Sequence, residues 1–479
     1  MLFNSLAFAI FLPLVFSFYW GLADKFRWII LLIASYYFYM SWNVKYVFLI
    51  LFTTVVSFFT AILLEKAKSV GAKKAILLVS AFSSLGVLFY FKYFNFISQS
   101  IVDFLNCFSI KMEPFMLNVI LPVGISFYTF QTLSYVIDVY KGDVKAEKHF
   151  GYYATFISFF PQLVAGPIER TKNLLPQIKS AHVFNYEQAT YGLKLMAWGF
   201  FKKLVIADTL SSPVKLVFDN PQEVQGFALI LASFFFTIQI YCDFSGYSDI
   251  AIGTAKLFGI DLMTNFKNPY LSKSIKEFWS RWHISLSTWF RDYVYIPLGG
   301  NRVGHIRHNI NLMITFLVSG LWHGANWTFV TWGGIHGLAQ ILENIIGKNT
   351  KANNSLTINF MKTVFTFTFC MCAWVFFVSK SLGDACYVFL HMFDGVSAFS
   401  TYLKNGLQVL HIDNTFLYRV GFSLIMLLTY DYLSMKRDVL LAVESKKGLI
   451  RWSVYILLTI WILFNIPYDN TTEFIYFQF

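Results

Sequence analysis

The residues most able to do chemistry in this sequence are histidines set among aromatic side chains. His323 lies in a strongly apolar stretch, residues 320–337, which reads GLWHGANWTFVTWGGIHG. Burying an ionisable group at membrane depth costs free energy, so such a residue suggests a functional site by default. Apolar surroundings disfavour the charged imidazole, and the neutral ring is the form that acts as a general base. The alternative is packing, because the Gly320/Gly324 and Gly333/Gly337 spacings let helix backbones approach closely, with His323 hydrogen-bonded between helices.

His336 ends the same stretch, 13 residues after His323. On one unbroken helix the two rings would point to roughly opposite sides, since each residue turns the helix by about 100°. We therefore do not expect them to be partners. His336 is expected to be structural, or to lie at the start of a following helix.

A second histidine, His283, lies in residues 275–296, IKEFWSRWHISLSTWFRDYVYI. Five apolar side chains there follow helical spacing: Phe278, Trp282, Leu286, Trp289 and Tyr293. The pattern predicts one amphipathic helix that is too charged to span a membrane. The residues by themselves favour an interfacial anchor, because such helices are rich in Trp and Arg. In that interpretation His283 makes a local hydrogen bond, with Ser280 and Ser287 one turn to either side.

Two carboxylates lie in residues 241–249, YCDFSGYSD, after an apolar run. Asp243 and Asp249 need partners if they lie at membrane depth. We expect Arg281 or Arg291 to supply them, in a structural ion pair.

The composition indicates that lipid is the main solvent of this chain. Of 479 residues, 57% are apolar and 13% are charged, against about 45–50% and about 25% in soluble domains. A soluble, disordered or fibrous protein is therefore excluded. The net charge of +12 comes largely from short basic clusters between apolar runs, such as Lys202/Lys203 and residues 436–451. That pattern follows the positive-inside rule and does not predict a nucleic-acid partner.

Motifs for other chemistries are missing from the sequence. The patterns HExxH, GxxxxGK[ST] and GxSxG do not occur. The five cysteines form no CxxC pair, so neither a metal site nor a disulfide framework is predicted.

The apolar runs predict an all-α, polytopic membrane protein with about 11–13 transmembrane helices. The candidate spans are residues 2–22, 27–43, 46–64, 75–97, 117–137, 186–206, 225–242, 308–330, 331–346, 358–379, 383–398, 415–433 and 449–467. Residues 138–185 and 243–307 mix aromatic and charged side chains, which predicts re-entrant or interfacial pieces on the cytoplasmic side. The basic clusters place residues 65–74 and 436–451 in the cytoplasm and both termini outside. We expect one membrane domain over residues 1–479.

Several segments together resemble a known family. They are FFPQLVAGPIER (159–170), QIYCDFSGYSDIAIG (239–253), NFKNPYLSKSIKEFWSRWHISLSTWFRDYVYIPLGGNR (265–302), SGLWHGANWTFVTWGGIHG (319–337) and the closing FIYFQF (474–479). These segments resemble the membrane-bound O-acyltransferases (MBOAT), in the bacterial AlgI-like branch that includes peptidoglycan O-acetylases; the teichoic-acid D-alanylation protein DltB is a more distant relative. The motifs are densest over residues 120–340.

The resemblance implies a ring of helices around a central funnel or tunnel, in the cytoplasmic (inner) membrane of a bacterium. It implies that His323 is the catalytic histidine and His283 a second histidine at the funnel. Around them we expect further tunnel or substrate-binding residues: Trp322, Asn326 (as an oxyanion donor), Trp327, Arg281 and Ser287. Lys273, Lys276 and Arg281 are expected either to attract the phosphates of CoA or to be ordinary positive-inside charge.

The activity implied is O-acetylation of a cell-surface or exported polysaccharide. The donor would be cytoplasmic acetyl-CoA, a substrate rather than a bound cofactor, and the acetyl group would pass to an extracytoplasmic SGNH-type transferase partner. Three alternatives stay open: D-alanyl transfer from a carrier protein, a transporter with His323 as a proton relay, and a non-enzymatic scaffold. Paired midplane charges and an inverted repeat would favour a transporter, and neither is evident.

Overall fold

The computed structural model describes residues 1–164, 166–346, 355–466 and 474–475. Within these residues the secondary structure is helical and no strand forms, which confirms the all-α prediction. The chain divides into two compact units, Met1–Leu193 with Ile250–Met263 and Lys194–Asp249 with Thr264–Phe479. Each unit is described by itself, and the expectation of one membrane domain over residues 1–479 stays a prediction.

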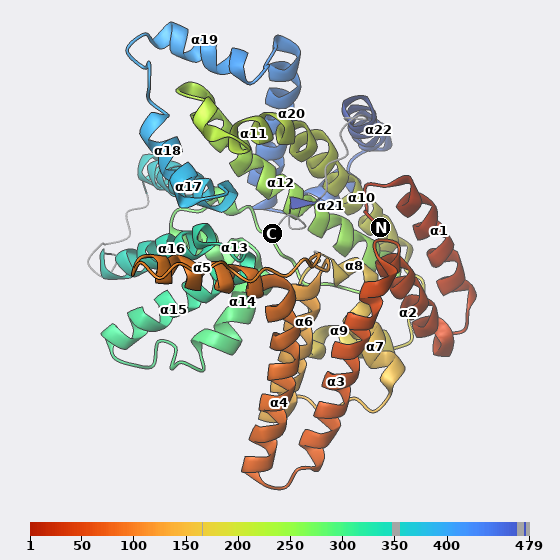
Figure 1. Cartoon of the computed structure of the whole chain (residues 1–479). Coiled ribbons are helices and arrows are strands. Elements are labelled where there is room, and N and C mark those ends of the chain that lie inside the picture. Colours follow the sequence, from red (N-terminus) through yellow and green to blue (C-terminus); the bar gives the residue numbers. More distant parts are fainter. Residues whose placement is uncertain (165, 347–354, 467–473, 476–479) are drawn as a thin grey trace. The chain divides into compact units, whose positions relative to one another are not determined.

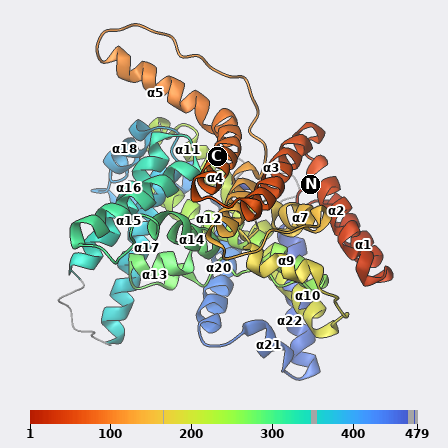
Figure 2. The same ribbon diagram turned by 90° about the horizontal axis from the view of Figure 1, so that it is seen from below.

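The first unit is built around three long helices, α3, α4 and α6, which run side by side (Figure 1). α6 is buried along most of its length, whereas most of α4 is exposed. Figure 2 shows α5 and the irregular segment after it extending away from these three helices. The helices of this unit are α1 (Leu6–Gly21), α2 (Asp24–Met40), α3 (Val47–Lys66), α4 (Val70–Leu88), α5 (Phe94–Asn106), α6 (Ile125–Lys141), α7 (Phe150–Ser158), α8 (Phe160–Leu163) and α9 (Thr171–Lys179).

A buried carboxyl group, Glu169, joins two separate segments of the first unit. Its side chain accepts hydrogen bonds from the backbone N–H of Met263 and from the side-chain amide of Asn173. Burial raises the pKa of Glu169 to about 7, against the opposing effect of these bonds. The FFPQLVAGPIER motif thus contributes a structural link between α9, which carries Asn173, and the segment around Met263.

The second unit holds the remaining motifs, which lie on short helices and on a tight helical hairpin. α10 and α12 belong partly to each unit. The helices are α10 (Tyr186–Phe200), α11 (Asp208–Phe218), α12 (Phe227–Leu257), α13 (Ile275–Arg281), α14 (Ile284–Phe290), α15 (His305–His323), α16 (Trp327–Ile346), α17 (Leu356–Val378), α18 (Leu382–His391), α19 (Phe399–Val409), α20 (Asn414–Ser434), α21 (Val439–Glu444) and α22 (Gly448–Asn465).

Five helical stretches of the described residues are long and apolar enough to cross a membrane. They are Val44–Lys66, Val70–Asn106, Phe227–Leu257, Leu356–Val378 and Gly448–Asn465. Each overlaps a predicted run, so the prediction of a multi-pass protein is confirmed. The predicted count of 11–13 spans rests also on shorter or more polar helices, such as Leu6–Gly21, and stays a prediction.

Helices α15 and α16 form a hairpin whose backbones touch through glycine, as the small-residue spacing predicts. A Cβ added to Gly320 would overlap the carbonyl oxygen of Phe329, and one added to Gly333 would overlap that of Phe316. The hairpin turns at Gly324–Asn326, so His323 and His336 lie on different helices. The separate runs predicted at 308–330 and 331–346 agree with two helices, although the turn comes at 324–326, before the predicted boundary.

We expect Gly320→Ala to destabilise the protein by about 1–3 kcal/mol, because the new methyl group has no space between the two helices. Gly421→Ala is the matched control, since a Cβ on this α20 glycine meets nothing within 4 Å. That change should be neutral or slightly stabilising, as alanine is the better helix former. Thermal unfolding in detergent compares the two, and equal melting temperatures would contradict the close contact.

Candidate active site

The segment around His283 is a broken helix rather than the single amphipathic helix expected for residues 275–296. α13 ends at Arg281, Trp282 is extended, and His283 takes a left-handed conformation with φ 43° before α14 begins at Ile284. A short π-helical segment, Arg291–Tyr295, follows α14. The apolar stripe largely survives the break, because Phe278, Trp282, Leu286 and Trp289 are all buried.

Asn265 supplies the physical reason for the break. Its carbonyl oxygen accepts from the N–H of Ile284 at 3.0 Å, and its side-chain oxygen accepts from the Ser285 hydroxyl at 2.7 Å. The bond from the Ile284 N–H, together with one from the Ser285 N–H to the same side-chain oxygen at 3.3 Å, replaces intrahelical partners that α14 lacks at its first turn. The helical spacing alone gives no sign of this cap, although a polar residue in an aromatic motif is a signal for one.

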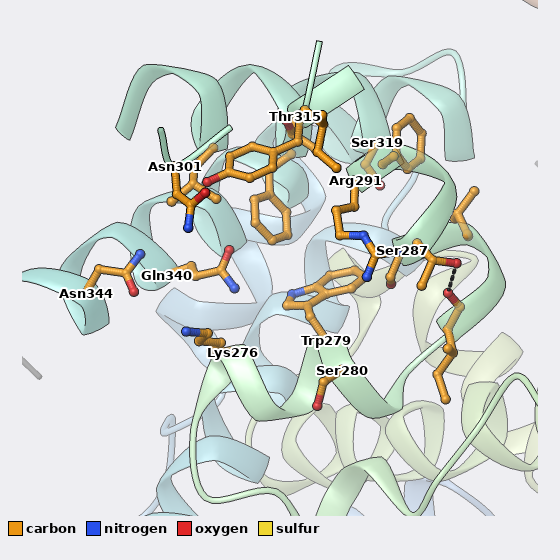
Figure 3. A pocket seen from close by; sticks show the side chains of 18 of the residues that line it. Lys276, Trp279, Ser280, Ser287, Arg291, Asn301, Thr315, Ser319, Gln340 and Asn344 are labelled. Carbon is orange, nitrogen blue, oxygen red and sulfur yellow. Dashed lines mark hydrogen bonds between the residues drawn. The ribbon is translucent and has the colours of Figure 1, made fainter. Parts of the chain in front are cut away.

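A cavity of about 780 Å³ lies between the broken helix and the α15–α16 hairpin. Figure 3 shows Lys276, Gln340 and Asn344 on one side of it, and Thr315 and Ser319 of α15 on another. Trp279 and Phe316 also line it. Among the described lining residues Lys276 and Arg291 are basic and none is acidic, so the cavity favours an anionic ligand.

The α15 wall of the cavity leads toward His323. Leu312, Thr315, Phe316 and Ser319 line the cavity, and their spacing places them on one helix face. His323 is four residues after Ser319, so it continues that face by one turn. We call the end of the cavity that Ser319 lines its inner end. The predicted catalytic histidine therefore lies about one helical turn beyond that inner end.

His323 is enclosed by aromatic rings. Its side chain is 3% exposed. The ring centroids of Trp322, Trp332 and Phe377 lie 4.9, 5.1 and 5.4 Å from that of His323. The aromatic rings therefore exclude bulk water from the His323 side chain.

His283 and His336 belong to the same aromatic cluster. His283 is fully buried, with its ring 4.6 Å from Phe244 and 6.3 Å from Trp322. His336 lies within α16, not at its start, and its Nδ1 accepts a hydrogen bond of 3.3 Å from Trp279 Nε1. Trp332 contacts both His336 and His323, at 5.0 and 5.1 Å.

The other predicted tunnel residues divide into two groups. Ser287 lines the cavity, and so does Arg291, which was expected only as an ion-pair partner. Arg281 is not among its lining residues and pairs with Glu277 at 2.5 Å. Asn326 caps α16 through Thr328 N–H and donates to the Lys380 carbonyl. Trp327 is 53% exposed, so its tunnel role, like the oxyanion role of Asn326, stays a prediction.

The two carboxylates make ion pairs, but the expected arginine partners are wrong. Asp243 pairs with Lys203 at 2.7 Å and Asp249 with Lys202 at 2.7 Å, while Arg291 pairs with its neighbour Asp292. Lys203 also contacts Asp208 at 2.9 Å.

The assignment of Lys202 and Lys203 to a basic loop is therefore also wrong. Both are buried on a π-helical segment, Phe201–Ala207, which continues α10. A buried aspartate that needs a counter-charge is the signal that points to them.

The closing motif also reaches this charged cluster. The backbone N–H of Ile475 donates to Asp243 Oδ2 at 2.8 Å, and the ring of Phe474 lies 4.7 Å from that of Tyr247. The other four residues of FIYFQF lie outside the described residues.

Comparison with known proteins identifies the family. Residues 37–381 match the model of the membrane-bound O-acyltransferase family. The chain is 41% identical to the probable alginate O-acetylase AlgI of Pseudomonas putida, over 82% of this chain and 80% of that protein. It is 34% identical to the peptidoglycan O-acetyltransferase of Helicobacter pylori (87% and 82%) and 32% identical to the teichoic acid D-alanyltransferase of Streptococcus thermophilus (48% and 59%). The chain therefore belongs to the membrane-bound O-acyltransferase family and is a membrane acyltransferase.

Proposed function

We propose that the protein transfers an acetyl group from cytoplasmic acetyl-CoA toward a polysaccharide outside the bacterial inner membrane. The observation that carries the proposal is the basic cavity whose α15 wall leads to His323. The two relatives that are similar over most of their length are named for acetylation of alginate and of peptidoglycan, both polysaccharides.

The cavity suits the donor in charge and in size. Lys276 and Arg291 provide cationic partners for the phosphates of CoA, and Asn301, Gln340 and Asn344 provide neutral hydrogen-bonding groups. A volume of about 780 Å³ lies within the range of about 300–1,000 Å³ typical of small-molecule pockets.

Contacts within the second unit support a cavity that opens toward the cytoplasm. The side chain of Asn268 donates to the Ser434 hydroxyl at 2.7 Å, and Arg281 lies 3.8 Å from the Met435 sulfur. The segments flanking α13 thus meet the end of α20 that leads into the basic segment 436–451. The positive-inside rule assigns that segment to the cytoplasm, with the chain termini outside.

His323 would act on the acceptor as a general base. The acceptor oxygen attacks the thioester carbonyl, so that a C–O bond forms and the C–S bond breaks. The hydroxyl proton passes to His323 and then to the departing thiolate of CoA. The final polysaccharide would be reached through an extracytoplasmic SGNH-type partner.

The test uses the full chain purified in nanodiscs with radiolabelled acetyl-CoA. We expect Lys276→Gln and Arg291→Gln each to raise KM for acetyl-CoA by about 10-fold, since each removes a charge-assisted contact of about 1.5–3 kcal/mol, with a smaller change in kcat. Lys404→Gln, at an exposed position of α19, is the control and should leave KM unchanged. A parallel reaction with a D-alanyl carrier protein tests the competing donor. Turnover with that donor and none with acetyl-CoA would overturn the proposal.

A further inference from the structure

Trp279 forms the partition between the cavity and the aromatic cluster around His323. Its indole lines the cavity and is 9% exposed. The ring centroids of Phe316 and Trp332 lie 5.3 and 5.7 Å from that of Trp279. Trp332 also contacts His323, at 5.1 Å, so one ring, that of Trp332, links Trp279 to the imidazole of His323.

The partition lies at the inner end of the cavity. α15 and α16 are antiparallel, with Gly333 against Phe316 and Gly337 against Met313. Asn344 and His308 therefore line one end of the cavity, and Phe316 and Ser319 line the other. Trp279 packs against Phe316, at the end nearer His323.

A hydrogen bond fixes the rotamer of this indole. Trp279 Nε1 donates to His336 Nδ1 at 3.3 Å, and the two rings meet nearly edge to face, 5.2 Å apart at 87°. Accepting this bond requires a neutral His336 with its proton on Nε2. His336 is itself fully buried within the closely packed hairpin, so it provides a rigid anchor.

We infer that Trp279, held by His336, sets the length of acyl chain that the enzyme transfers. This rests on the proposed function, in which the donor occupies the cavity. With the phosphates of CoA held near Lys276, on the side of the cavity that Gln340 and Asn344 line (Figure 3), the acyl group points toward the inner end and meets the indole. An acetyl group ends before this wall, whereas each further methylene must displace a buried, hydrogen-bonded ring. Trp279 is the specificity determinant, and His336 is a positioning residue that acts through it.

The experiment measures initial rates with acetyl-, butanoyl- and hexanoyl-CoA, using the full-length protein in nanodiscs. We expect the wild type to prefer acetyl, and Trp279→Ala and Trp279→Leu to raise the butanoyl-to-acetyl ratio of kcat/KM by about 10-fold or more, given the usual discrimination per methylene. His336→Phe keeps an aromatic ring but removes the acceptor, and should shift the ratio in the same direction. His336→Asn restores an acceptor and should keep the wild-type ratio to within about 3-fold.

Trp289→Ala is the matched control. Trp289 is 6% exposed and lies on the neighbouring α14, but it is not among the residues that line the cavity. Its loss loosens packing without enlarging the cavity, so the ratio should not move even if the total rate falls. Leucine at position 279 keeps an apolar core if the alanine variant fails to fold.

The outcomes separate the two proposals. A wild type that uses acetyl-CoA, with an unchanged chain-length profile in folded Trp279 variants, overturns the role of Trp279 and leaves the proposed function intact. A ratio that rises equally in Trp289→Ala also overturns it. A wild type that transfers no acyl group from any CoA thioester overturns both.

Discussion

Replacing His323 with alanine is expected to reduce acetyl transfer by about 10²–10⁴-fold, the usual contribution of a general base. The residue lies just beyond the inner end of the cavity and is enclosed by Trp322, Trp332 and Phe377. Single-turnover rates in nanodiscs, with saturating acetyl-CoA, measure the effect on the chemical step.

The control for this variant is His391→Ala. His391 is a partly exposed histidine of the same unit and pairs with Asp394, so its loss should leave the rate unchanged. Both variants must elute as monodisperse protein and melt within a few degrees of the wild type. A folded His323→Ala protein with undiminished acetyl transfer would refute a catalytic role for His323.

The second large effect is expected for Lys203→Met, which should destabilise the protein by about 3–5 kcal/mol. Lys203 contacts Asp208 and Asp243, and all three side chains are at most 5% exposed. Removing the single cation leaves two carboxylates in a low-dielectric setting without their shared partner. Thermal or urea unfolding in detergent measures the loss.

An exposed ion pair provides the comparison. Lys380 and Asp219 are 2.8 Å apart with side chains 61% and 62% exposed, so Lys380→Met should cost only about 0–1 kcal/mol. Adding Asp243→Asn to Lys203→Met should recover part of the lost stability, because one uncompensated charge is removed. Equal costs for the two lysine variants would show that the buried cluster contributes no more than a surface pair.

Hydropathy predicted most of the long apolar helices, but it missed shorter ones such as α11 and α19 and did not show where polar contacts redirect a helix. The run predicted at 358–379 agrees closely with α17 (Leu356–Val378). The run at 225–242 is too short, because α12 continues to Leu257. The reason is that Asp243 and Asp249 are neutralised by lysines, so the polar stretch after Tyr241 remains helical.

In the candidate site, too, the features that depend on local sequence were predicted and those that depend on tertiary hydrogen bonds were not. His323 and the glycine contacts of its hairpin follow from residue type and spacing, which depend on local sequence alone. The break at His283 depends on Asn265, 18 residues earlier, and the wall at Trp279 depends on an acceptor in α16. Such tertiary hydrogen bonds leave no periodic trace in the sequence, so the apolar spacing of residues 275–296 predicted one amphipathic helix where the structure has a break.

The buried lysines also constrain how this protein is made. Lys202 and Lys203 leave the ribosome well before Asp243, which lies 40 residues beyond Lys203. Until α12 is synthesised, Asp208 is the one carboxylate of the cluster available to them, and a lysine at mid-bilayer costs about 2.5–3.5 kcal/mol on the translocon scale. We therefore expect the end of α10 to become stably buried only after α12 has been synthesised and can pair with it. Crosslinking of nascent chains stalled before and after residue 249 would reveal this delayed burial.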